Sequence, residues 1–159
     1  MNPRRFLNAW GPVILWMAFM IFGSTDLMSA EHTSRFITPF LLWLEPAIST
    51  ADIAQVHLFV RKAAHLAEYA ILTGLLFRAL RGRVNGFWRR AGIAFFPIII
   101  FAAADEYHQS FIPSRTASPV DVLVDYCGAL LGILICRAIY LARGPGRDGE
   151  KREHELEID

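Results

Sequence analysis

Three groups of ionisable side chains stand at the ends of apolar stretches of this chain. They are Lys62, His65 and Glu68; then Asp105, Glu106 and His108, followed by the polar but neutral Gln109; and finally Asp121 and Asp125. Arg115 lies in the short connection between the second and third groups. Charges at the edge of a hydrocarbon layer are costly, and they are kept mainly where they pair, bind something or react. These residues therefore predict where a site lies more directly than they predict its chemistry.

Two kinds of chemistry fit these residue types. Lys62 and Arg115 could bind a phosphate or carboxylate, with Glu68, Asp105, Glu106 and Asp125 orienting them. Alternatively, His65 or His108 could be a general base whose tautomer a carboxylate sets, while Arg115 stabilises developing negative charge. The catalytic candidates would then be His65, Glu68, Asp105, Glu106 and His108.

A metal site is the weaker variant of the enzymatic hypothesis. It would use His65, Glu68, Asp105 and His108 as ligands, but the sequence has no H-E-x-x-H or comparable ligand spacing. It also has no motif of an activated serine or cysteine nucleophile. We therefore expect no metal and no cofactor.

Each group also has a purely structural explanation. His65 and Glu68 could form a buried pair that holds two helices together, and Lys62 could extend its ammonium group toward the membrane surface. Asp105 and Glu106 could be counter-ions of the cations, in a closed network of salt bridges without a ligand.

Asp121 has its own structural explanation. It follows Ser118 and Pro119, and a serine N-cap, a proline at the first helical position and an acid in the first turn are ordinary features of a helix start.

Composition and hydropathy indicate a membrane protein. The chain has 159 residues, of which 54% are hydrophobic and 19% charged, against roughly 25% charged residues in soluble domains. Four apolar stretches approach the ~20 residues that a helix needs to cross a bilayer. They run from about Phe6 to Gly23, Ala63 to Leu80, Ala91 to Tyr107 and Pro119 to Leu141. We therefore predict an all-α, polytopic membrane bundle of four transmembrane helices.

The arginines predict the orientation of this bundle. Arg4 and Arg5 precede the first stretch, four arginines lie between Leu80 and Ala91, and more follow the fourth stretch. By the positive-inside rule both termini are cytoplasmic, and the chain is a multi-pass protein of the cell (inner or cytoplasmic) membrane. The three ionisable groups then meet at the outer face. The arginine-rich connection is explained as a topology signal, and we expect no nucleic-acid binding.

The connection between the first two stretches contains an apolar segment from Phe36 to Ile48, interrupted by Pro39, Glu45 and Pro46. It is too short and too broken to span a membrane. We predict a membrane-associated outer segment, which could lie on the outer leaflet, re-enter the bundle as a cover, or pack on the helices as a hydrophobic lid. The domain organisation is then a transmembrane domain over residues 1–143 and a charged, solvated cytoplasmic tail over residues 144–159.

Helical spacing predicts how the fourth stretch is oriented. Asp121 and Asp125 are four residues apart, and Gly128 and Gly132 continue the same stripe. A G-x-x-x-G pattern lets two helix backbones approach closely. We therefore expect the face that contains both aspartates to point into the bundle.

The same argument applies to the third stretch. Its spacing places Asp105 on one face with His108 and Gln109, and Glu106 about a quarter-turn away. On the second stretch, Lys62, His65 and Glu68 share a face.

Three ordered motifs resemble the VanZ-like family. They are residues 61–69 (RKAAHLAEY), residues 105–115 (DEYHQSFIPSR) and residues 118–132 (SPVDVLVDYCGALLG). The resemblance extends over about residues 7–141. This sequence departs from the family pattern at Ser114, where the family often has glycine, and at Asp125, where it often has asparagine.

The resemblance implies a small multi-span membrane protein of the cell envelope. The family's namesake is linked to low-level resistance to the lipid-tailed glycopeptide teicoplanin. The expectation is a polar outer-leaflet cavity that binds a lipid headgroup or a lipophilic ligand; the alternative is an intramembrane hydrolase or transferase acting on a lipid-linked phosphate or ester. Expected partners are membrane lipids and a lipid-linked or lipophilic small molecule, and the sequence does not indicate an oligomeric state.

Overall fold

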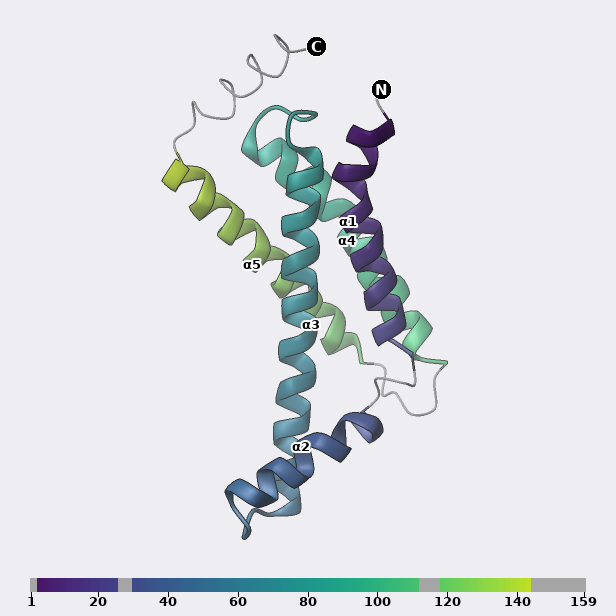
Figure 1. Ribbon diagram of the computed structural model, residues 1–159, viewed down its shortest axis with the longest axis vertical. Coiled ribbons are helices and arrows are strands. Elements are labelled where there is room, and N and C mark those ends of the chain that lie inside the picture. The colour runs from purple at the N-terminus through teal and green to yellow at the C-terminus, as the bar shows by residue number, and fades with distance from the viewer. Residues whose placement is uncertain (1–2, 26–29, 112–117, 144–159) are drawn as a thin grey trace.

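The structure, a computed structural model, describes residues 3–25, 30–111 and 118–143. Within these residues the chain forms five helices and no strand (Figure 1). The helices are α1 (Pro3–Gly23), α2 (Ala30–Leu44), α3 (Thr50–Leu80), α4 (Phe87–Gln109) and α5 (Pro119–Arg143). The predicted all-α fold is confirmed.

Four of these helices, α1, α3, α4 and α5, are long and apolar enough to cross a membrane. The four predicted spans are therefore confirmed, and the chain is a multi-pass membrane protein. Many large apolar side chains point away from the bundle, as expected where lipid rather than water surrounds the helices. Examples on the four helices are Leu15, Phe19, Phe59, Ile100, Leu123 and Leu134.

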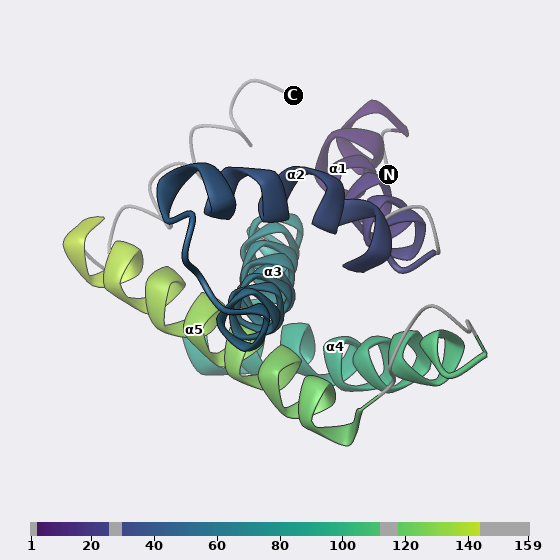
Figure 2. The ribbon, with the colours of Figure 1, turned by 90° about the horizontal axis from the view of Figure 1, so that it is seen from below.

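Helix α3 is the centre of the bundle and packs against each of the other four helices. Its most extensive contact is with α5. Figure 2 looks along α3 and shows α1, α4 and α5 arranged around it. The fully buried side chains of Tyr69, Leu72 and Thr73 all belong to this helix.

The helix that contains the second predicted span begins well before Ala63. The helix begins at Thr50, where the Ser49 hydroxyl accepts a hydrogen bond from the Asp52 backbone N–H and caps the first turn. Polar residues between Thr50 and Lys62 interrupt the apolar pattern but do not interrupt the backbone hydrogen bonds of the helix. The 31 residues of α3 measure about 46 Å at 1.5 Å per residue, so the helix is longer than the ~30 Å hydrocarbon core.

Helix α2 lies against this N-terminal extension of α3, where Thr38 Oγ1 and His57 Nε2 are 3.1 Å apart. Figure 1 shows α2 beside the lower end of α3 and below the lower ends of α1, α4 and α5. Helix α2 therefore packs on one helix of the bundle, at the part of α3 that extends past the other helices. The side chains of Phe36 and Trp43 are 80% and 77% exposed, and the location of α2 on the outer leaflet stays a prediction. The predicted tail over residues 144–159 lies outside the described residues.

The predicted close approach of α5 to its neighbour is confirmed, and the neighbour is α3. A methyl group added at Gly128 would collide with the backbone carbonyl of Leu66, and one added at Gly132 would lie 2.7 Å from the carbonyl oxygen of Ala70. Both glycines are buried on the same face as Asp121 and Asp125. The aspartates therefore point toward α3, as predicted.

We predict that Gly128→Ala destabilises the bundle. The added methyl group meets backbone rather than a movable side chain, and overpacking of this kind costs roughly 1–3 kcal/mol. The thermal unfolding midpoint of the purified protein in detergent should fall. Gly92→Ala on α4 is the matched control, because its methyl group would meet no atom within 4 Å. An equal midpoint for the two variants would contradict the close α3–α5 contact.

Candidate functional site

The polar end of the bundle is the end at which α1 and α4 finish and α5 begins. The α3–α5 contact brings Asp121, in the first turn of α5, beside two cations of α3. Arg61 Nη2 lies 2.7 Å from Asp121 Oδ2, and Lys62 Nζ lies 3.0 Å from Asp121 Oδ1. The Asp121 side chain is 5% exposed, whereas the side chains of Arg61 and Lys62 are 21% and 31% exposed. The carboxylate is thus buried beneath two cations that reach the surface.

One turn deeper, His65 of α3 faces Asp125 of α5. His65 Nδ1 lies 3.0 Å from Asp125 Oδ1, and both residues are buried. Because a carboxylate only accepts hydrogen bonds, Nδ1 donates this one. The bond fixes the orientation of the imidazole ring.

Helix α4 adds Glu106 and Gln109, both of which are buried. Gln109 Nε2 donates to Asp105 Oδ2 at 3.0 Å, and Gln109 Oε1 accepts a long hydrogen bond of 3.5 Å from Arg61. Glu106 Oε1 accepts a hydrogen bond from the backbone N–H of Ser118, just before α5 begins. Three helices therefore contribute to one group of polar side chains, which we call the polar network. Its members are Arg61, Lys62, His65, Asp105, Glu106, Gln109, Asp121 and Asp125.

Several buried polar atoms in this region have no hydrogen-bond partner among the described residues. They are Tyr69 Oη, Glu106 Oε2, Asp125 Oδ2 and Ser24 Oγ. Buried polar groups are normally paired, and each unpaired one costs free energy. Two of these atoms are carboxylate oxygens, which accept hydrogen bonds, and two are hydroxyls, which can also donate them.

The structure brings together most of the predicted site residues but not all of them. Gln109 and Asp105 are hydrogen-bonded on the face that the spacing gives them, but this face is not the most buried one: Glu106 and Gln109 are buried, Asp105 is half-buried, and His108 is exposed. Residues 106 and 109 are three apart and share the face toward α3 and α5, which turns His108 outward. Arg115 lies outside the described residues.

Glu68 is half-buried on α3, and its backbone carbonyl accepts a hydrogen bond of 3.0 Å from Trp16 Nε1 of α1. His65 takes Asp125 rather than Glu68 as its buried carboxylate partner. Helix α1 thus packs against α3 beside the polar network. The spacing of polar residues in the second stretch did not predict this contact.

Arg61 and Tyr69 belong to the network region but were not among the predicted site residues. Their positions could have been inferred from the sequence, because Arg61, His65 and Tyr69 follow one another at intervals of four residues and share one helical face. Arg61 forms an ion pair with Asp121, 2.7 Å apart, across the α3–α5 contact.

Among the residues that the structure describes, no three His, Cys, Asp or Glu side chains are grouped in a way that could hold a metal ion.

A family model described as VanZ/LLP1 matches residues 9–141 of the chain. The chain belongs to this family. Comparisons with curated proteins and with solved structures found no match. The resemblance carried by the three motifs is thereby confirmed, and two of the motifs supply the facing residues of the polar network, on α3 and α5.

We predict that His65→Ala destabilises the VanZ/LLP1-family bundle. Removing the imidazole takes away the one described hydrogen-bond partner of the buried Asp125 carboxylate, and an unsatisfied buried polar group costs about 1–3 kcal/mol. The thermal unfolding midpoint in detergent should therefore fall. His108→Ala, at an exposed position near the same end of the bundle, should leave it unchanged.

A double-mutant cycle with Asp125→Ala distinguishes this bond from a general packing effect. Residues in direct contact show coupling energies of roughly 0.5–3 kcal/mol. A coupling energy of zero between His65 and Asp125 would contradict the hydrogen bond as the source of the loss.

Proposed function

We propose that this protein binds the polar headgroup of an amphiphile, a membrane lipid or a lipophilic antibiotic, within the polar network. The observation that supports this most directly is the set of buried, unpartnered polar atoms among charged side chains from three helices. A bound headgroup would complete their hydrogen bonds, whereas a closed structural network would not leave them unpaired.

The arrangement of charge indicates what kind of headgroup fits. The Lys62 side chain, which is 31% exposed, is available to a phosphate or carboxylate that competes with Asp121 for its N–H groups. The unpartnered oxygens of Glu106 and Asp125 require donors, such as hydroxyl or ammonium groups. A headgroup with an acidic group and several donors, such as a glycerol, ethanolamine, sugar or peptide headgroup, meets both requirements.

The distribution of arginine supports a location at the outer leaflet. Arg78, Arg81, Arg83, Arg89, Arg90, Arg137 and Arg143 lie toward the end opposite the polar network. By the positive-inside rule that end and both termini are cytoplasmic, and the network opens toward the outside of the cytoplasmic membrane. Arg61 and Lys62 are exceptions, and they share Asp121 as a counter-ion.

Binding at this location connects the site to the cell envelope. Teicoplanin has a lipid tail that places it at the outer leaflet, where the network would meet its polar part. We propose that binding there contributes to glycopeptide resistance of the teicoplanin type, which the family's namesake is linked to.

The pairing of His65 with Asp125 favours a second candidate, an intramembrane hydrolase or transferase. A carboxylate that orients an imidazole is the arrangement that general bases use. The substrate would be a lipid-linked phosphate or ester, with His65 as the base and Asp125 as its positioning residue. Release of inorganic phosphate or of a free acid from such a lipid by the wild-type protein, lost in His65→Gln, would favour this candidate over binding alone.

We predict that Tyr69→Phe weakens binding without weakening the fold. The Tyr69 hydroxyl is buried and has no partner among the described residues, so its removal leaves no protein group unpaired and the unfolding midpoint should not fall. A lost hydrogen bond to ligand is worth about 1 kcal/mol, which corresponds to a several-fold rise in the dissociation constant. The measurements are teicoplanin binding to the protein in nanodiscs and mass spectrometry of the lipids that co-purify with it.

Tyr107→Phe is the control, because this tyrosine is 69% exposed near the same end of α4. A glycopeptide without a lipid tail tests whether the tail is needed. Unchanged binding in Tyr69→Phe, or the absence of any bound lipid or teicoplanin in the wild type, would refute the proposed site.

A further inference from the structure

The lysine and the arginine of the polar network are gathered at one of its carboxylates. Arg61 and Lys62 both form ion pairs with Asp121, at 2.7 and 3.0 Å. Asp121 lies in the first turn of α5, and its side chain is 5% exposed. The ion pairs of the network are therefore concentrated at the end of the bundle, on a single carboxylate.

The other three carboxylates of the network form no ion pair with a lysine or an arginine in the part of the chain that the structure describes. Asp105 accepts a hydrogen bond from the amide of Gln109. Glu106 accepts one from the backbone N–H just before α5, and Asp125 shares one with His65. Amide and backbone N–H groups have no net charge. His65 is thus the one side chain bonded to these three carboxylates that can carry positive charge, so negative charge is in excess.

A buried hydroxyl group lies near all three of these carboxylates. Tyr69 is fully buried, and its Oη has no hydrogen-bond partner among the described residues. Asp105, Glu106 and Asp125 each lie close enough to Tyr69 to interact with it electrostatically. Glu106 and Asp125 are 7% and 1% exposed, and each has one carboxylate oxygen without a partner. Two acceptor oxygens and one hydroxyl are therefore available to a ligand in the same buried region.

The excess of negative charge distinguishes between the donors that a headgroup can offer. A hydroxyl group satisfies an acceptor oxygen but brings no positive charge, and a buried carboxylate without a counter-charge is costly. A quaternary ammonium group brings positive charge but has no N–H donor. A primary ammonium group brings one full charge and three N–H donors, and charge-assisted hydrogen bonds are roughly twice as strong as neutral ones. It therefore meets both requirements of the buried region.

We propose that the polar network selects amphiphiles whose headgroup contains a primary ammonium group, a selection that rests on the headgroup binding proposed above. The ammonium group donates hydrogen bonds to Asp125 Oδ2 and Glu106 Oε2, and the Tyr69 hydroxyl accepts a third. An aminophospholipid and a lipophilic amine share this chemistry, and they are the two sources to test.

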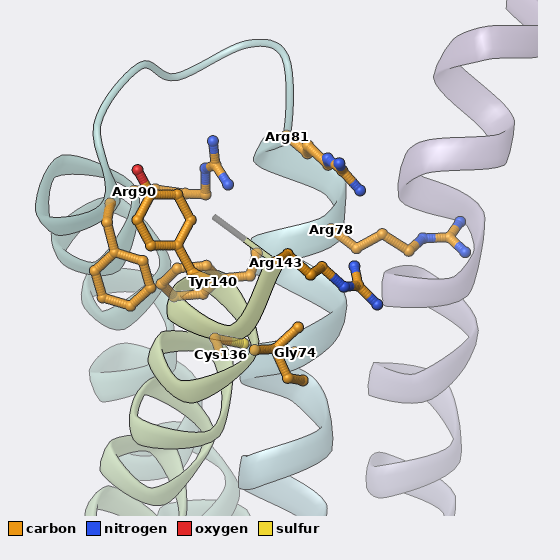
Figure 3. Close-up of a pocket in the computed structure, with 10 residues that line it drawn as sticks. Gly74, Arg78, Arg81, Arg90, Cys136, Tyr140 and Arg143 are labelled. Atoms are coloured by element: carbon orange, nitrogen blue, oxygen red, sulfur yellow. The ribbon is translucent and has the colours of Figure 1, made fainter. Parts of the chain in front are cut away.

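The opposite end of the bundle does not offer an ammonium group the same partners. A hollow of about 170 Å³ lies there between α3, α4 and α5, and Figure 3 shows Arg78, Arg90 and Arg143 around it. None of the described residues that line this hollow is acidic. Selection of ammonium headgroups by the protein can therefore be assigned to the polar network by changing its carboxylates.

The test compares lipids that differ in the donor of their headgroup. The full-length protein is placed in nanodiscs of phosphatidylcholine with equal minor shares of phosphatidylethanolamine and phosphatidylglycerol, and native mass spectrometry counts the retained lipids. These headgroups contain a quaternary ammonium, a primary ammonium and hydroxyl groups, respectively. Dodecylamine and dodecanol, each added to the protein in phosphatidylcholine alone, form the second arm.

Two variants of matched chemistry assign the selection to the network. Asp125→Asn removes one carboxylate charge at nearly unchanged size and keeps an oxygen that accepts the hydrogen bond of His65. Glu45→Gln removes one carboxylate charge at an exposed position outside the network and is the control.

We expect the wild type and Glu45→Gln to retain phosphatidylethanolamine in preference to phosphatidylglycerol. Asp125→Asn should lower this preference roughly tenfold, which corresponds to about 1.4 kcal/mol. Binding of dodecylamine but not of dodecanol, lost in Asp125→Asn and without retention of phosphatidylethanolamine, would support the ammonium site and assign it to a lipophilic amine. An equal preference in the wild type and Asp125→Asn would overturn the proposal.

A further variant covers the case in which Asp125→Asn does not fold. Glu106→Gln removes the other carboxylate charge and keeps an oxygen that accepts the backbone N–H before α5. An unchanged preference for phosphatidylethanolamine in this variant would overturn the proposal.

The outcomes also separate ammonium selection from headgroup binding itself. Retention of phosphatidylglycerol or teicoplanin, without any preference for an ammonium group, would overturn the selection and leave headgroup binding in place. The absence of any bound lipid, amine or teicoplanin would overturn both.

Discussion

The backbone contact between α3 and α5 is the constraint on which the rest of the structure depends. Inside a membrane the hydrophobic effect does not drive helices together, so close packing and polar contacts must do so. Gly128 and Gly132 leave room for the carbonyls of Leu66 and Ala70. The same contact sets the register that places Asp125 opposite His65. The glycines and the charged residues are therefore parts of one arrangement, and neither explains the α3–α5 interface alone.

The polar network is poorly explained as a source of stability. Burying charged groups costs more free energy than many ion pairs return, and well-packed apolar residues are often equally stable. Asp121 is paired with two cations, but the second oxygen of Asp125 and that of Glu106 have no partner among the described residues. Asp125 has one hydrogen bond, with His65, and this bond leaves its second oxygen without a partner among the described residues. This imbalance is what a ligand with hydrogen-bond donors would correct.

Features that depend on helical periodicity could be predicted from the sequence. Features that depend on how the helices pack against one another could not. Four apolar stretches and the glycine stripe sufficed to predict the spans and the inward face of α5, because helical geometry alone determines both. The start of α3 at Thr50 was missed because a helix that leaves the membrane no longer needs apolar residues. The exposure of His108 could not be predicted, because two faces of α4 contain polar residues and only the packing against α3 and α5 selects between them.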